Sequence, residues 1–340
     1  MVLNDDWLNL TPEEPIDTGV PILDPHHHLW DRPGNRYMLE ELVADTTPHN
    51  VRQTVFIECT SMYRRTGPEQ FKCVGETEYV QGVAAMSANG GFGPLVANAG
   101  IVGTADLRLG DGVVPVLEAQ LAASPNRFRG IRHRAAWPMA RRPAPGQPDQ
   151  VEHLLLDADF RAGFRHLRLY GLSFEAWLFH TELTDVADLA RAFADTTIIL
   201  NHLGGPILSG EYGTADEVFP RWKQDIAEVA ACPNVVMKVG GIQMAVNGFG
   251  WHERPKPPTS DELLEVNRRW YEHAIESFGP ARCMFESNFP VDRVSCSYTV
   301  LWNQFKKLAQ PYRPDERVAM LHDTAARVYR LPLAAELGPV

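Results

Sequence analysis

The stretch VPILDPHHHLWD, residues 20–31, begins with an apolar run and continues into three consecutive histidines. Side chains alternate across a β-strand, so His26 and His28 share one face of a strand here and His27 points to the other. Two neutral imidazoles on one face can hold a divalent cation or donate to a substrate carbonyl, whereas a pair bonded to the backbone would be structural. The stretch therefore predicts a first strand, and the role of its histidines depends on what lies beside them.

Seven further short runs rich in β-branched residues follow it, at 51–59, 98–107, 127–135, 172–179, 196–204, 234–242 and 282–290. Between them lie longer segments whose apolar residues recur at three- and four-residue steps, as on one face of a helix. Alternating strands and helices predict a parallel sheet, and eight strands are the number that closes a small barrel. No Gly-x-Gly-x-x-Gly motif follows the first strand, which argues against a Rossmann-type dinucleotide site.

The predicted fold is α/β, a single-domain (β/α)8 TIM barrel over residues 20–332, with an N-terminal extension (1–19) and a C-terminal tail (333–340). Two segments rich in Pro and Gly, 141–150 and 244–260, are predicted to be loop insertions rather than domain linkers. The second follows the seventh strand at its C-terminal end, so we expect it to cover the barrel mouth as a lid.

The composition narrows the classes of partner. The chain of 340 residues has 43 acidic and 32 basic residues and a formal net charge of -11, which disfavours nucleic acid and favours a small-molecule substrate. It contains no run of 18 apolar residues and begins with no signal-peptide pattern, so we predict a cytoplasmic protein without membrane contact. A homo-oligomer is compatible with the sequence. Five cysteines without CxxC spacing are predicted to pack in the core.

Polar residues gather where the predicted strands end, and TIM barrels place their active sites at the C-terminal strand ends. Arg132 and His133 lie in the fourth strand, His202 ends the sixth and Lys238 ends the seventh. Arg132 can hold both oxygens of a substrate carboxylate, and Lys238 can contribute a point charge. For both residues the alternative is a structural ion pair within the barrel.

Four motifs in this order, DPHHHLWD (24–31), FRGIRH (128–133), LNHLGGP (200–206) and MFESNFPVD (284–292), resemble the amidohydrolase-2 branch of the amidohydrolase superfamily. More narrowly they resemble its lactonase group, which includes 2-pyrone-4,6-dicarboxylate lactonase, sulfomuconolactone hydrolase and sugar-lactone hydrolases. The resemblance runs from about residue 22 to 331. It implies a hydrolytic barrel in which His26, His28 and His202 surround the reacting carbonyl. Some members of the group hold a divalent metal there, Zn²⁺ or Mn²⁺ being the expected ions, and others work without one.

One position departs from the family pattern. Asn288 stands where the eighth strand normally supplies an aspartate as general base, and an amide cannot take a proton from water. Two other carboxylates could replace the aspartate. Glu286 points into the barrel like Asn288 but one layer deeper, and Asp292 follows in the loop above the barrel mouth. We favour Asp292 as the base. The alternatives are a buried carboxylate paired with Arg or Lys for Glu286, and a turn or cap residue for Asp292.

Further substrate contacts are predicted at Glu58, His180 and Asn288. Glu58 lies near the end of the second strand, where its alternative is a structural ion pair. His180 follows the fifth strand, where its alternative is a helix cap. Four tryptophans near strand ends or in a loop either line a pocket around a ring or pack in the core: Trp30, Trp137, Trp177 and Trp251.

The predicted function is a hydrolase that opens a lactone or similar cyclic ester of a small carboxylate-bearing substrate by attack of water on a polarised carbonyl. A first alternative is a metal-dependent non-oxidative decarboxylase of an aromatic acid, which resembles the lactonases in fold but requires the eighth-strand aspartate. A second is a ligand-binding barrel without catalysis. Asn288 motivates this second alternative, and the histidines on strands one and six argue against it.

Overall fold

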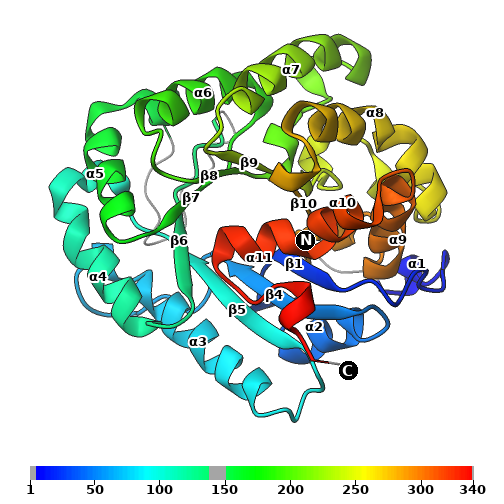
Figure 1. Cartoon of the computed structure of the whole chain (residues 1–340), viewed down its shortest axis with the longest axis horizontal. Coiled ribbons are helices and arrows are strands. Elements are labelled where there is room, and N and C mark those ends of the chain that lie inside the picture. Colours follow the sequence, from blue (N-terminus) through cyan, green and yellow to red (C-terminus); the bar gives the residue numbers. More distant parts are fainter. Residues whose placement is uncertain (1–4, 138–150, 339–340) are drawn as a thin grey trace.

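A computed structural model describes residues 5–137 and 151–338 of the chain. Eight strands form one parallel sheet in chain order: β1 (Ile22–His27), β4 (Val51–Ile57), β5 (Val96–Gly103), β6 (Phe128–Arg132), β7 (Ser173–Ala176), β8 (Ile198–Leu200), β9 (Val235–Gly240) and β10 (Cys283–Glu286). Just beyond the strand ends the first and last strands meet, where the backbone N–H of His28 donates to the carbonyl of Phe289 at 2.8 Å. The sheet is thus a barrel (Figure 1). The predicted TIM barrel is confirmed, and each predicted strand range overlaps one observed strand.

Helices surround the strands on the outside (Figure 1). They are α2 (Leu39–Thr46), α3 (Val74–Ala88), α4 (Val114–Ala123), α5 (Ala158–Leu169), α6 (Leu183–Ala192), α7 (Ala215–Ala230), α8 (Ser260–Phe278) and α9 (Tyr298–Ala309). A short hairpin of β2 (Trp30–Arg32) and β3 (Asn35–Tyr37) follows β1 directly. The chain closes with α10 (Pro314–Val318) and α11 (Thr324–Tyr329).

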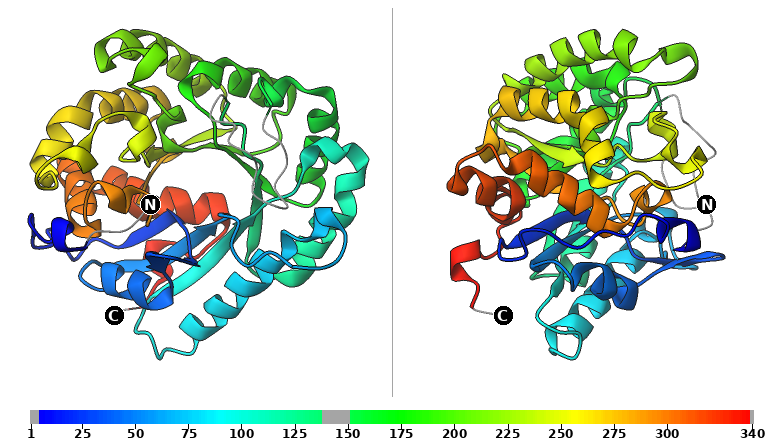
Figure 2. Two further views of the ribbon diagram at one scale, coloured as in Figure 1. Left: turned by 180° about the vertical axis from the view of Figure 1, so that it is seen from behind. Right: turned by 90° about the vertical axis from the view of Figure 1, so that its right-hand side faces the viewer.

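The strand alternation separates two cores. In β4, Val55 and Ile57 belong to a small cluster inside the barrel, whereas Phe56 between them packs in the large cluster under the outer helices. The inner cluster also contains Tyr329 of α11. In the side view of Figure 2, α11 (red) lies on one side of the barrel and the loop after β9 (yellow) on the other. Apolar side chains therefore close the end of the barrel at which the strands begin. The opposite end, where the strands finish, is left as the place for a site.

The segments outside the barrel are tied to it. Residues of the N-terminal extension reach the loop after β9, where Thr11 Oγ1 donates to the carbonyl of Pro257 at 2.8 Å. In the same loop, which the sequence predicted as a lid, Trp251 is buried and residues 252–256 are exposed. The predicted loop at 141–150 lies outside the described residues. All five cysteines are free and buried, which confirms their place in the core. Among the described residues, no helix has the length and apolar character needed to cross a membrane.

Candidate active site

A cavity of about 580 Å³ lies at the C-terminal strand ends. It is lined by His28, Trp30, Arg32, Cys59, Thr60, Arg132, Arg134, Trp177, His202, Met244, Asn288 and Val291. Three of these residues are arginines, and no Asp or Glu is found among these described lining residues. The cavity therefore presents positive charge inside a chain whose net charge is -11. This local charge favours an anionic ligand.

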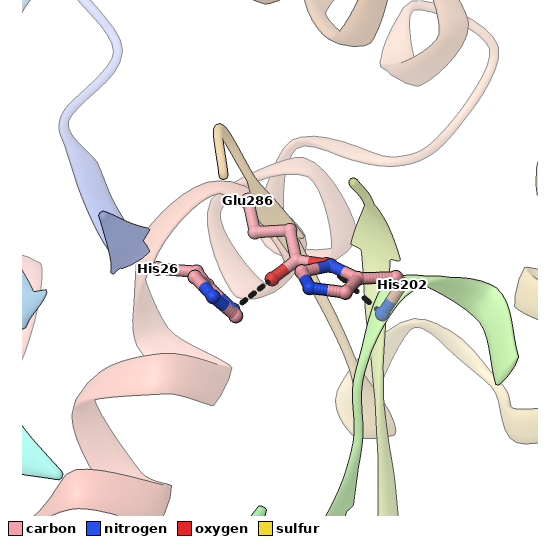
Figure 3. A group of neighbouring side chains, drawn as sticks. All are labelled: His26, His202 and Glu286. Atoms are coloured by element: carbon pink, nitrogen blue, oxygen red, sulfur yellow. Dashed lines mark hydrogen bonds and ion pairs between the residues drawn. The ribbon is translucent and has the colours of Figure 1, made fainter. Parts of the chain in front are cut away.

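Glu286 joins two of the predicted histidines at the base of the site (Figure 3). Its Oε1 accepts from Nδ1 of His202 at 2.7 Å and from the His202 backbone N–H at 3.1 Å. Its Oε2 lies 2.7 Å from Nδ1 of His26, and the two imidazole centroids are 4.5 Å apart. Because a carboxylate can only accept, Nδ1 of His202 carries the proton and Nε2 keeps its lone pair. Glu286 and His202 thus form a carboxylate–histidine pair of the kind that serves as a general base.

Two glycines, the last residue of β9 and the one after it, let Glu286 and His202 come together. His202 has φ 54°, and Gly241 has φ +67°. A Cβ on Gly241 would lie 1.9 Å from Nδ1 of His202, and one on Gly240 would lie 2.3 Å from the carbonyl oxygen of Glu286. No side chain fits at either place, so the diglycine lets the imidazole and β10 approach each other.

His28 and Asn288 leave two acceptors facing each other. Nδ1 of His28 donates to the carbonyl of Ile57 at 2.8 Å, so its Nε2 bears a lone pair, and this atom lies 3.3 Å from Oδ1 of Asn288. The Asn288 amide is oriented by its Nδ2, which donates to Asp292 Oδ1 at 2.8 Å. Burial, with the charge of Arg132, holds the pKa of His28 well below its usual value, so the imidazole does not supply a second proton. A water, a substrate hydroxyl or a cation is needed to satisfy both atoms.

His26 is flanked by two cations. Lys238 Nζ lies 3.2 Å from its Nδ1, and Arg132 Nη1 lies 3.4 Å from its Nε2. Burial, followed by the charge of Lys238, holds the pKa of His26 well below its usual value. His26 is therefore a neutral imidazole at neutral pH.

Arg132 and Glu58 form the ion pair that the sequence left open as an alternative. Arg132 Nε donates to Glu58 Oε1 at 2.8 Å and its Nη2 donates to the Glu58 carbonyl, while Arg134 Nε reaches the same carboxylate at 3.1 Å. Although burial opposes ionisation, Arg134 and Arg132 hold the pKa of Glu58 below its usual value. The guanidinium fork that we expected on a substrate carboxylate is thus engaged by Glu58.

Lys238 lies deeper than the sequence suggested. It is fully buried, and its Nζ is 2.9 Å from Oε2 of Glu175. Glu175 in turn accepts from Tyr329 of α11 and from Asn201. Lys238 does not line the cavity, so its direct contact with the site is through His26.

Asp292 and His180 are also set back from the cavity lining. Asp292 is fully buried behind Asn288, and its Oδ2 accepts from the backbone N–H of Gln243 at 3.1 Å. Burial raises the pKa of Asp292 well above its usual value. The Nδ1 of His180 accepts from the backbone N–H of Ile207 at 3.3 Å, and the structure does not bring this ring together with the other histidines.

The family model described as Amidohydrolase matches residues 23–331. The chain belongs to the amidohydrolase family. It is 31% identical to y4mH, an uncharacterised protein of Sinorhizobium fredii, over 92% of this chain and 100% of that protein. It is 28% identical to L-fucono-1,5-lactonase of Burkholderia multivorans, over 70% of this chain and 73% of the relative. Its fold matches an amidohydrolase of Burkholderia multivorans solved with bound zinc, at a TM-score of 0.70 and 24% identity, over 92% of this chain and 99% of that one.

Within this amidohydrolase, the donor atoms at the base of the cavity fit a divalent ion. Ligand atoms of His26, His202 and Glu286 all lie within 4.8 Å of one another. The sequence prediction contained His28 in place of Glu286. His28 Nε2 and Asn288 Oδ1, two acceptors without a proton between them, add a second reason for a cation, because both would be satisfied as its ligands.

Several residues of this amidohydrolase site were missed by sequence reasoning. Arg134 lies two positions after Arg132, so strand parity was the signal that could have found it. Arg32 reaches the cavity from the β2–β3 hairpin, where its Nη2 donates to the Cys59 carbonyl at 2.7 Å and its guanidinium lies 4.1 Å from the Trp30 ring centroid. Of the four tryptophans, Trp30 and Trp177 line the cavity.

Proposed function

We propose that this amidohydrolase opens a lactone or similar cyclic ester of a small carboxylate-bearing molecule by attack of water. The observation that carries the proposal is the Glu286–His202 pair at the base of a cavity whose charged lining residues are arginines. A general base beneath a cationic cavity suits hydrolysis of an anionic ester. The similarity to a curated sugar lactonase supports the reaction class.

His202 is the proposed base rather than Asp292. Burial lowers the pKa of His202 below its usual value while the charge of Glu286 opposes the shift, so the imidazole is neutral at neutral pH and can accept a proton. Water oxygen attacks the carbonyl carbon as its proton passes to Nε2. The ring C–O bond then breaks and the leaving alkoxide takes that proton, which gives an open hydroxy acid. Glu286 stabilises the imidazolium in between, whereas Asp292 lies behind Asn288 and orients its amide.

A divalent cation bound by His26, His28 and His202 would supply Lewis-acid polarisation of the carbonyl, and because it would occupy Nε2 of His202, the base role proposed for His202 applies to the enzyme without the ion. Asn288 turns its Oδ1 toward the same place. Arg32 and Arg134 stand in the cavity wall and are the proposed partners of the substrate carboxylate; Arg134 also reaches Glu58, but its side chain is 28% exposed, against 4% for Arg132. Trp30 and Trp177 line the same cavity and offer apolar surface to the substrate ring.

The test measures turnover of a panel that pairs neutral sugar lactones with lactones and pyrones that bear a carboxylate. A pH indicator detects the acid that each hydrolysis releases. We expect hydrolysis, with kcat/KM favouring the anionic member of each pair. Arg134→Gln should reduce that preference about tenfold, the equivalent of ~1.4 kcal/mol. Arg36→Gln, which changes an arginine held by Glu40 and Glu41 away from the cavity, should not.

Aryl carboxylates in the same panel, with detection of CO₂, test the decarboxylase alternative. Release of CO₂ without lactone hydrolysis would overturn the proposal in favour of that reaction. Saturable binding of panel members without any turnover would instead leave a ligand-binding barrel.

A further inference from the structure

A second cluster of potential metal ligands lies outside the cavity, on the segments that follow β6 and β7. His153 precedes the short helix Leu154–Leu156, Glu182 ends the short helix His180–Glu182, and Asp185 lies in the first turn of α6. Ligand atoms of the three residues lie within 4.8 Å of one another. None of the three lines the cavity.

Both carboxylates hold His153. Its Nδ1 lies 2.8 Å from Oδ2 of Asp185, and its backbone N–H donates to Oε1 of Glu182 at 3.0 Å. The residue has φ 54°, a left-handed conformation that is strained for a residue other than glycine. The side chain of His153 is 54% exposed, so its ring can adjust and an ion can reach it.

Glu182 has an oxygen that this network does not use. The residue is only 3% exposed, and among the described residues its Oε2 makes no hydrogen bond of normal geometry, although the backbone N–H of Trp137 lies near enough to the carboxylate to lower its pKa slightly. Burial raises the pKa of Glu182 to about 7, and the nearby charge of Asp185 acts in the same direction. Among residues 5–137 and 151–338, no Lys or Arg forms an ion pair with Glu182 or Asp185. A buried carboxylate oxygen without a partner is costly, and a cation beside it removes the cost.

Helix capping does not account for this arrangement. Acidic residues at the N-terminus of α6 interact favourably with the helix dipole, which explains Asp185 in its first turn. Glu182 occupies the N-cap position, yet its side chain caps no backbone N–H of α6 and turns to His153 instead.

We propose that His153, Glu182 and Asp185 bind one divalent transition-metal ion, with zinc the best match to one nitrogen and two carboxylate oxygens. The ion takes the place of the proton on Nδ1 of His153 and contacts the unused Oε2 of Glu182. Ligand atoms on one zinc ion are about 3.4 Å apart for bonds of about 2.1 Å, so the cluster contracts by rotation of the exposed histidine. The bound ion clamps the segment before α5 to the start of α6. This site is independent of the proposed lactone hydrolysis.

The test is a zinc titration of the full chain after chelator dialysis, against a competing chromogenic chelator. His153→Asn removes the imidazole and keeps a residue that tolerates the left-handed conformation. His166→Asn is the matched control, because His166 also lies 2.8 Å from an aspartate, Asp111, but with an exposed carboxylate. We expect His153→Asn to lose one equivalent of zinc, or at least tenfold in its affinity, and His166→Asn to match the wild type. Zinc should also raise the Tm of the control more than that of His153→Asn.

Two further variants separate this site from the barrel. Glu182→Gln keeps the side-chain volume and should weaken the same equivalent at least tenfold. The double variant His26→Ala/His202→Ala should still bind this zinc equivalent but should lose lactone hydrolysis. Equal zinc stoichiometry and affinity in wild type, His153→Asn and Glu182→Gln would overturn the proposal and leave the proposed function untouched.

Discussion

Replacing Glu286 with glutamine removes one charge from the base of the site and places an amide NH2 where Oε2 now faces His26. Glutamine has the same shape, and its oxygen can still accept from Nδ1 and the backbone N–H of His202, which now lie 2.7 and 3.1 Å from the carboxylate. What disappears is the attraction between a carboxylate and the imidazolium formed during reaction. For charges about 4 Å apart at an effective dielectric constant of about 20 this is about 4 kcal/mol. One decade of rate corresponds to about 1.4 kcal/mol, so kcat should fall about 10³-fold.

The assay is the initial rate at saturating lactone between pH 5 and 9, with Tm measured on each variant. Because burial lowers the pKa of His202 below its usual value and Glu286 opposes the shift, the acid limb of wild-type kcat should lie below pH 6.5. Glu286→Gln should move that limb to lower pH, since the opposing charge is gone. Asp292→Asn is the matched control, a buried carboxylate behind Asn288 that we expect to cost less than tenfold in kcat.

Two outcomes refute this reasoning. If Glu286→Gln keeps kcat within about threefold of wild type, His202 does not depend on the carboxylate as a base. If Asp292→Asn loses more activity than Glu286→Gln and removes the acid limb, the base is on the Asp292 side, as the sequence alone led us to predict.

Three further predictions follow from buried groups. His27→Phe should keep kcat, because the His27 ring faces Phe56 outside the barrel. Burial lowers the pKa of His27 to about 3, so below about pH 6.5 the wild type should lose about 1.4 kcal/mol of unfolding free energy per pH unit from this residue. The variant should not show this loss in urea unfolding at several pH values. Lys238→Met should lower unfolding free energy by about 3–5 kcal/mol because Glu175 is left buried without its cation, and adding Glu175→Gln should recover much of the loss. Asn288→Asp should tighten metal binding in the barrel at least tenfold in a chelator competition, because a carboxylate is a better ligand than an amide; an unchanged affinity would argue that no ion contacts this position.

The parts of the site within one strand were readable from local pattern. The spacing of His26 and His28 placed both imidazoles on one face, and the structure brings both together with His202 at the base of the cavity. The position of Glu286 in the eighth strand also predicted that its side chain points into the barrel, but not that it would bond to His202. A strand has a fixed period of two, so such statements need no knowledge of the neighbouring strands.

What the sequence by itself determined was therefore the eight-stranded barrel and the direction of the side chains in its first and eighth strands, because these follow from alternation, helical period and strand count. Only the tertiary structure decided which inward groups meet. Glu58 pairs with the guanidinium of Arg132, Glu175 pairs with Lys238, and Glu286 pairs with His202. These partners lie on different strands, and their contacts depend on the relative heights of the strands in the closed barrel. That stagger is set by how all eight strands pack together, so no single segment of sequence carries it.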